Sequence, residues 1–374
     1  MKITFVMAGG FGLSGGDRVI ATYAKHLRQR GHEVFVVARP VQPLGIRKQI
    51  RSWLTGNRVT SQKQLPSHFD HLGVPHQLID SYRPVQDQDV PDADVVIATW
   101  WETAEWIAKL SPAKGAKVYF VQHHEVFDYL PKAQVEASYL LPLHKIVVSQ
   151  WLADVMQTMY GDHHVSLVRN SVDINQFIAP PRGKQPVPTF GIMYSMLPWK
   201  GCEFGLQAFS IAAQRRPGIR LVAFGQKAPL PHLPLPPETE YIQSPPPQML
   251  KEIYARCDAW LFSSKSEGFG LPILEAMACR TPVIATPAGA APELLASGGG
   301  LLASPHGPEE MAKRIEQICD LSNEAWQTMS QVAYDEARYY TWSDATADFE
   351  AALKTAIEQQ PQRQASCAIA QEAC

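Results

Sequence analysis

The chain has 374 residues, of which 45% are hydrophobic and 19% charged, and its formal net charge is −2. This length exceeds the usual size of a single hydrophobic core, so we expect two domains. The near-neutral charge, without any nucleic-acid-binding motif in the sequence, excludes the strongly basic proteins that bind DNA or RNA.

The cysteines and the N-terminus indicate where the protein works. The six cysteines are scattered without a C-x-x-C pair, which argues against a disulfide framework and a zinc ribbon. The first apolar run is shorter than that of a signal peptide, and no segment approaches the ~20 apolar residues of a membrane span. We therefore expect a cytoplasmic protein.

The first half of the sequence begins as a βαβ unit. Residues 3–8 are a predicted strand, followed by a glycine loop and by a helix over residues 17–30 with apolar side chains at i, i+3, i+4 spacing. A continuous apolar run over residues 33–38 predicts a buried parallel strand. Further predicted strands lie at residues 95–99, 118–121, 145–149 and 165–168, mostly with helical patterns between them.

A proline-rich stretch at residues 179–188 marks the predicted domain boundary, and the alternation then restarts. The predicted strands are 189–193, 220–224, one near 241–242, 259–263 and 282–286, and the predicted helices are 203–215, 248–256, 272–280 and those from 308 onward. Ser343 is expected to cap a final helix. The predicted domains are residues 1–182 and 183–342, with a C-terminal helix at 343–360 and a disordered tail at 361–374.

The glycine loop after the first strand matches G-x-G-x-x-G at residues 10–15. By itself this is a weak dinucleotide-binding signal. Arg39 stands near the end of the second strand, where a dinucleotide-binding protein would have an acid that binds the ribose. The only dinucleotide site compatible with this residue is an NADP site in which Arg39 binds the 2′-phosphate. A structural turn is another alternative. We favour a loop that faces the diphosphate of a nucleotide sugar.

The most specific feature is a pair of glutamates, Glu267 and Glu275, on either side of a predicted helix start. Backbone N–H groups at a helix N-terminus favour a phosphate, and glycines let the backbone approach it closely. Glu275, one turn into the helix, can reach a ribose diol, and Glu267 can accept hydrogen bonds from sugar hydroxyls. The residues expected to contact the substrate in this loop are Gly268, Phe269, Gly270 and Leu271.

Residues 263–291 resemble family 4 of the glycosyltransferases, whose E-x7-E motif is matched by Glu267 and Glu275. Further matches are Gly15-Gly16-Asp17-Arg18, Gly31-His32-Glu33-Val34 and Arg169-Asn170-Ser171-Val172-Asp173, with Phe177. The resemblance covers most of residues 1–350 and is weakest across about 40–90. It implies an α/β protein of the GT-B fold, with two Rossmann-like doubly wound domains facing a central cleft. It also implies a retaining transfer and a C-terminal helix that returns to the N-terminal domain.

The resemblance also implies how the diphosphate is neutralised. In the family, a lysine after the first strand of the second domain acts with an arginine five residues earlier. Lys200 matches the lysine, whereas Ser195 stands at the arginine position. One positive charge is therefore missing, and either Arg169, Arg18 or another cation replaces it or the site depends more on helix dipoles.

A histidine at the end of a strand in the N-terminal domain lies against the donor sugar in this family. His123 is the predicted counterpart here, in preference to its neighbour His124. Ligands of open α/β sheets gather at the carboxyl ends of the strands, which agrees with this position. Glu125 is expected near the acceptor.

Two further features bear on cofactors and membranes. Asp87-Gln88-Asp89 and Asp92-Ala93-Asp94 resemble metal-binding D-x-D strings, but both lie in a polar loop far from the glutamate pair, so we interpret them as solvated acids. Residues 46–54 form a basic amphipathic segment that suits docking on an anionic membrane, with packing on its own domain as the alternative.

These features together predict a hexosyltransferase that moves a sugar from a nucleotide diphosphate to a glycan, lipid-linked or small-molecule acceptor, in cell-surface polysaccharide or glycoconjugate synthesis. No cofactor, metal or nucleic-acid partner is expected, and peripheral contact with the inner membrane face is compatible with the basic segment. An NADP-dependent oxidoreductase and a catalytically silent nucleotide-sugar-binding relative are the alternatives. The predicted catalytic residues are Glu267, Lys200 and His123, and the predicted substrate-binding residues are Gly15, Gly16, Asp17, Ser195, Gly268, Phe269, Gly270, Leu271 and Glu275.

Overall fold

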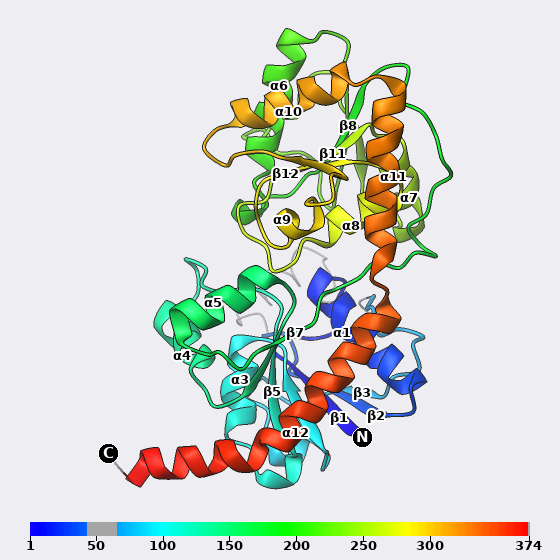
Figure 1. Ribbon diagram of the computed structural model, residues 1–374. Coiled ribbons are helices and arrows are strands. Elements are labelled where there is room, and N and C mark those ends of the chain that lie inside the picture. Colours follow the sequence, from blue (N-terminus) through cyan, green and yellow to red (C-terminus); the bar gives the residue numbers. More distant parts are fainter. Residues whose placement is uncertain (43–65, 373–374) are drawn as a thin grey trace, which may run out of the picture. The chain divides into compact units, whose positions relative to one another are not determined.

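The computed structural model describes residues 1–42 and 66–372, with side chains described through residue 360. Its contacts divide the chain into two units. The first unit contains Met1–Val148, Leu152–Val168 and the residues from Thr346 onward, and the second contains Ser149–Trp151 and Arg169–Ala345. Each unit is an α/β domain built on a parallel sheet (Figure 1).

The sheet of the first unit has the strand order β3-β2-β1-β4-β5-β6-β7 among the described residues, and every pair is parallel. Its strands are β1 (Lys2–Met7), β2 (Glu33–Ala38), β3 (His76–Leu78), β4 (Val95–Ala98), β5 (Ala116–Val121), β6 (His144–Val147) and β7 (Ser166–Leu167). The connecting helices include α1 (Gly15–Gln29), α3 (Trp101–Ala108), α4 (Lys132–Tyr139) and α5 (Gln150–Tyr160). The order reverses between β1 and β4, where a doubly wound sheet usually binds its ligand.

The second unit repeats this plan with the strand order β10-β9-β8-β11-β12-β13. Its strands are β8 (Thr189–Met193), β9 (Arg220–Gly225), β10 (Glu240–Gln243), β11 (Ala259–Phe262), β12 (Val283–Ala285) and β13 (Gly300–Leu302). Its helices are α6 (Cys202–Arg215), α7 (Leu250–Ala255), α8 (Leu271–Ala278), α9 (Ala291–Leu294), α10 (Pro308–Asp320) and α11 (Asn323–Tyr339). Here the strand order reverses between β8 and β11.

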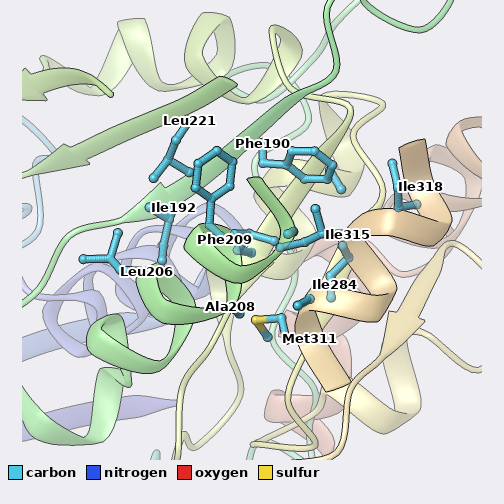
Figure 2. Packing of buried hydrophobic residues seen from close by; sticks show 14 of the residues in the cluster. Phe190, Ile192, Leu206, Ala208, Phe209, Leu221, Ile284, Met311, Ile315 and Ile318 are labelled. Atoms are coloured by element: carbon cyan, nitrogen blue, oxygen red, sulfur yellow. The ribbon is translucent and has the colours of Figure 1, made fainter. Parts of the chain in front are cut away.

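A hydrophobic core holds α6 and α10 against the second sheet, as Figure 2 shows. Phe190 of β8 packs against Phe209 of α6, with ring centroids 6.3 Å apart. Met311 and Ile315 of α10 belong to the same buried cluster. Each fully buried side chain of this kind contributes about 1.5–3 kcal/mol, so the core stabilises the strand from whose end the candidate site begins.

The boundary between the units lies earlier in the chain than the predicted one at residue 182. The proline-rich stretch belongs to the second unit, because its backbone is hydrogen-bonded there. Lys184 N donates to Asn323 Oδ1 at 3.0 Å, and Gln185 N donates to Asp258 Oδ1 at 2.8 Å. The prolines therefore shape an extended segment that is attached to the second sheet rather than a free linker.

The last helix, α12 (Trp342–Glu372), packs on the first unit. Phe349 stacks on Tyr23 with centroids 4.3 Å apart and also contacts Phe5 at 6.2 Å. Glu350 forms an ion pair with Arg30 at 2.8 Å. The C-terminal helix thus completes the core of the N-terminal domain.

The ends of α12 differ from the prediction. Thr341, not Ser343, caps the helix, because Asp344 N donates to Thr341 Oγ1 at 3.2 Å and Thr341 N donates to Asp344 Oδ2 at 2.8 Å. This reciprocal pair satisfies two donors at the helix start. At the other end the helix continues to Glu372 through the predicted tail. The residues after Pro361 are mostly Ala, Gln and other good helix formers, so one proline does not end it.

No helix within the described ranges combines the length and the apolar character needed to cross a membrane.

Candidate functional site

The candidate site of the second unit lies at the carboxyl ends of β8 and β11. These parallel neighbours flank the reversal of strand order, which is the usual ligand position in a doubly wound sheet. A small pocket at this point is lined by Met193, Lys200, Trp260, Leu261, Phe262, Ser263, Ser264 and Pro272. The sheet thus brings the turn that carries Lys200 together with the loop that leads to α8.

Lys200 and Glu267 form an ion pair beside this pocket. Lys200 Nζ lies 2.6 Å from Glu267 Oε1, and Ser264 Oγ donates to the same oxygen at 2.7 Å. The two charged side chains are only 21% and 10% exposed, so water competes weakly for their hydrogen bonds. Two residues predicted separately therefore belong to one cluster. Ser264, which the sequence analysis did not select, is its third member.

Two glycines allow the close approach of these loops. Gly201 follows Lys200 with φ of 59°, and a Cβ at this position would collide with the carbonyl oxygen of Ser263. Gly270 precedes α8 with φ of 102°, and a Cβ there would lie 2.9 Å from the Phe262 ring. Side chains other than glycine rarely adopt such φ values. The turn and the loop therefore depend on glycine for both conformation and space.

The loop into α8 is held by its carbonyl groups. Gly268 O accepts hydrogen bonds from Ser149 Oγ at 2.7 Å and from Trp151 Nε1 at 2.9 Å, both from the short segment that groups with the second unit. Phe269 O accepts from Ala290 N at 2.8 Å. α8 then begins at Leu271. The N–H groups at such a helix start precede the first intrahelical hydrogen bond, and they are the groups that attract anions.

Glu275 lies one turn into α8 and is only 5% exposed. The hydroxyl of Tyr254, in α7, donates to Glu275 Oε2 at 2.8 Å. Glu275 is the residue predicted to reach a ribose diol, whereas Tyr254 is not among the predicted site residues. An aromatic residue on a helix gives no signal that distinguishes it from an ordinary core residue.

The position of the missing family arginine has no positive charge. Ser195 follows β8, and its hydroxyl accepts from Leu197 N at 3.3 Å. Arg169, one of the expected substitutes, forms an ion pair with Glu293 at 3.5 Å. Arg18 lies on α1 of the first unit. Its role and that of Arg169 as replacement cations stay predictions.

In the first unit, the glycine loop leads into α1. Gly15 and Gly16 begin this helix, and Ser14 caps it by accepting a hydrogen bond from Asp17 N at 3.0 Å. A Cβ on Gly16 would lie 3.7 Å from the side chain of Gln122, so the loops after β1 and β5 are neighbours. Burial raises the pKa of Asp17.

The loop after β5 separates the two histidines by their contacts. His123 Nδ1 lies 2.9 Å from the carbonyl oxygen of His124, and the His123 ring packs on Phe127. His124 Nε2 is 2.8 Å from the hydroxyl of Tyr160, and burial lowers the pKa of His124. His124 is thus directed at a side chain of its own domain, and the contact of His123 with a donor sugar stays a prediction.

Glu125 is not on the surface, contrary to its expected place beside an acceptor. It is 1% exposed, and its Oε2 accepts from Trp101 N at 2.9 Å and from Tyr119 OH at 3.3 Å. Burial raises the pKa of this carboxyl well above its usual range. Glu125 therefore binds the backbone at the start of α3 and does not serve as a ligand contact.

Arg39 is also occupied within the first unit. Its Nη1 and Nη2 donate to the carboxylate of Glu102 at 3.0 and 2.8 Å, and its Nε donates to Ala8 O at 2.9 Å. The side chain is buried and stacks on the rings of Tyr82 and Trp106. A guanidinium held on three sides is poorly placed to bind a 2′-phosphate, which weighs against the NADP alternative.

The acids of the D-x-D strings have structural partners. Asp89 pairs with Arg83 at 2.5 Å, and Asp92 pairs with Lys114 at 2.9 Å. Among residues 1–42 and 66–372, no group of three or more His, Cys, Asp or Glu side chains could hold a metal ion. The basic segment at residues 46–54 lies outside the described residues, so its contact with a membrane stays a prediction.

Two doubly wound parallel domains, with Lys200 and the loop of Glu267 at the reversal of strand order in the second, are the architecture of the GT-B class of proteins. Two family models match consecutive parts of the chain: "Glycosyltransferase Family 4" over residues 13–176 and "Glycosyl transferases group 1" over residues 175–335. The chain belongs to this family of glycosyltransferases.

The sequence matches to curated relatives cover only part of each relative. The D-inositol 3-phosphate glycosyltransferase of Corynebacterium aurimucosum is 34% identical over 111 residues, which are 29% of this chain and 26% of the relative. The O-antigen chain mannosyltransferase B of Escherichia coli is 31% identical over 107 residues, 28% and 27% of the two chains. The matched segment thus spans about a quarter of each of these relatives.

Solved structures share the fold along nearly the whole chain. HepE of Anabaena, in complex with UDP and glucose, superposes with a TM-score of 0.66 at 19% identity and covers 98% of this chain and 100% of its own. A TarM variant of S. aureus reaches a TM-score of 0.72 at 10% identity, with 94% and 100% covered. At these identities the likeness shows the GT-B fold alone.

Proposed function

We propose that this protein transfers a hexose-type sugar from a nucleoside diphosphate to a glycan, lipid-linked or small-molecule acceptor, with retention at the anomeric carbon. The observation that carries the proposal is the cluster in which Lys200 contacts Glu267, together with Ser264, in the loop before α8. The names of the curated relatives and the UDP-glucose complex of HepE support this donor class. The proposed setting is the synthesis of cell-surface polysaccharides or glycoconjugates.

In this reaction the bond between the anomeric carbon and the donor phosphate breaks, and a bond to the acceptor oxygen forms on the same face of the sugar. The acceptor proton passes to the departing diphosphate. Negative charge builds on that leaving group, so the site must supply fixed positive charge. The Lys200 ammonium and the N–H groups of residues 269–271 would do so. Glu267 would bind sugar hydroxyls, and we assign neither glutamate as a general acid or base.

The N-terminal domain would bind the acceptor. Its Gly15-Gly16 loop would approach the diphosphate through backbone N–H groups, and His123 would contact the donor sugar. Because Lys200 and the helix start supply the charge, the proposal requires no metal and no cofactor. The free cysteines Cys202, Cys257, Cys279 and Cys319 support action in the reducing cytoplasm, and peripheral membrane contact rests on the basic segment alone.

A thermal-shift panel tests the proposal. UDP-, GDP-, dTDP- and ADP-sugars should be compared with NADPH, and the best donor then assayed for turnover with water or an acceptor. We expect one nucleotide sugar to stabilise the protein and to be consumed. Lys200→Met should abolish turnover, whereas Lys313→Met, which removes an exposed lysine paired with Glu310, should not.

The alternatives give different results in the same experiment. A shift with NADPH alone would indicate an oxidoreductase. Binding of a nucleotide sugar without any turnover would indicate a catalytically silent relative.

A further inference from the structure

Tyr254 connects the inside of the second unit with the glutamate expected to bind the donor ribose. Its hydroxyl donates to Glu275 Oε2 at 2.8 Å. Tyr254 is 0% exposed and Glu275 is 5% exposed. The two residues lie on different helices, α7 and α8. The glutamate therefore receives a hydrogen bond from a neighbouring element, on the side away from solvent.

The ring of Tyr254 is itself held by aromatic neighbours. Trp260 lies edge-on with its centroid 4.5 Å away, and Phe177 and Phe224 contact the ring at 6.1 and 6.3 Å. The backbone carbonyl of Tyr254 accepts from Thr281 Oγ1 at 2.7 Å. Such edge-to-face packing leaves the ring little freedom, so the position of the hydroxyl is set before any ligand arrives.

We propose that Tyr254 is a positioning residue that orients the carboxylate of Glu275 for the ribose diol of the donor. An ionised carboxylate has about four acceptor positions, and Tyr254 takes one of them on Oε2. This bond selects one orientation of a side chain that would otherwise lose rotamer freedom on binding. Preorganisation of this kind raises affinity because the ordering cost is met during folding. The inference rests on the proposed function, because it takes Glu275 as the ribose contact.

The test separates ribose recognition from general damage. Calorimetry measures the Kd of UDP and of 2′,3′-dideoxy-UDP, or of the GDP pair if the thermal-shift panel selects guanine. We expect the parent to prefer the diol by roughly tenfold or more, since hydrogen bonds to a charged group are among the stronger ones. Tyr254→Phe should reduce this preference several-fold while the dideoxy analogue binds as before. A merely structural role would weaken both ligands equally.

A double-mutant cycle and a matched control complete the experiment. In a Glu275→Gln background, Tyr254→Phe should cause no further loss of preference. Tyr194→Phe removes the hydroxyl of another buried tyrosine of the second unit, which donates to Leu233 O at 2.8 Å. This control should keep the parent preference. If Tyr254→Phe does not fold, Tyr254→Met removes the same donor and fills the space with an adaptable apolar side chain.

The possible outcomes distinguish a failure of the positioning role of Tyr254 from a failure of the proposed function. A parent that prefers the diol, together with a Tyr254→Phe variant that prefers it equally, would overturn the positioning role alone. A parent that binds both nucleotides equally would show that Glu275 does not contact the ribose, and both assignments would fall. A parent that binds no nucleoside diphosphate would refute the proposed function itself.

Discussion

Replacing Glu267 by glutamine should separate the binding of the nucleotide from the handling of the sugar. Glu267 Oε1 lies 2.6 Å from Lys200 Nζ. A diphosphate must compete with this carboxylate for the lysine. Glu267→Gln removes the competitor, so the affinity for UDP should not fall. The transfer rate should fall by about tenfold or more, because an amide cannot replace the carboxylate in positioning the sugar hydroxyls.

The structure also sets the size of the effect on stability. A hydrogen bond to a charged group contributes about 1.5–3 kcal/mol when it is shielded from water. Lys200 is 21% exposed, and water can solvate part of the ammonium once its partner is neutral. We therefore expect Glu267→Gln to cost about 1–2 kcal/mol, which lowers Tm by a few degrees for a domain of this size. If the same 1–2 kcal/mol no longer opposes binding, UDP affinity rises by about fivefold to thirtyfold.

Scanning calorimetry, titration calorimetry with UDP and a donor-turnover assay measure these effects. Asp162→Asn is the matched control, because Lys145 and Asp162 also pair at 2.6 Å and are similarly shielded, at 3% and 17% exposed. It should lower Tm and leave UDP binding unchanged. Tenfold weaker UDP binding by Glu267→Gln would refute the reasoning, since Glu267 would then be needed to place Lys200 for the phosphate.

Other expectations follow from the same contacts. Glu275→Gln should weaken UDP binding roughly tenfold or more in calorimetry with little change in kcat, because a ribose contact is present in both ground and transition states. Burial raises the pKa of Glu125 above its usual 4.5, so its contribution to stability is complete below that pH and is lost as pH rises through the folded pKa. Urea unfolding should therefore show that the stability of the parent falls relative to that of Glu125→Gln as pH rises above about 5. The hydrogen bonds from Lys354 and Arg30 lower the pKa of Glu350 to about 2, so its contribution is present above 4.5 and lost as pH falls through about 2. Glu350→Gln should thus be less stable than the parent at neutral pH, and the gap should close in acid. Turnover should persist in EDTA, and a complete loss restored by Mg²⁺ or Mn²⁺ would contradict charge neutralisation by Lys200 and the helix start.

Continuous apolar runs made much of the fold predictable. The strands Glu33–Ala38 and Thr189–Met193 have the predicted bounds. A strand that is buried on both faces is a continuous apolar run in the sequence, so its ends can be recognised from the sequence. The predicted start of α8 was one residue off, since Pro272 marks the first turn of a helix. The short strands His76–Leu78 and Gly300–Leu302 were missed. Each has three residues at the edge of a sheet, which is too few for a periodic pattern.

The sequence by itself determined the alternating elements of the two domains, because these depend on local patterns, and it predicted Lys200, Glu267 and Glu275 as site residues from short motifs. Only the tertiary structure decided which of them meet. Lys200 reaches Glu267 because β8 and β11 are neighbours across the reversal of strand order, although the two residues are 67 positions apart. Tyr254 contacts Glu275 because α7 and α8 pack side by side, and no sequence pattern predicts this contact. Hydrophobic periodicity specifies where an element lies and which face it buries, whereas the partner of a buried polar atom depends on how the elements are stacked.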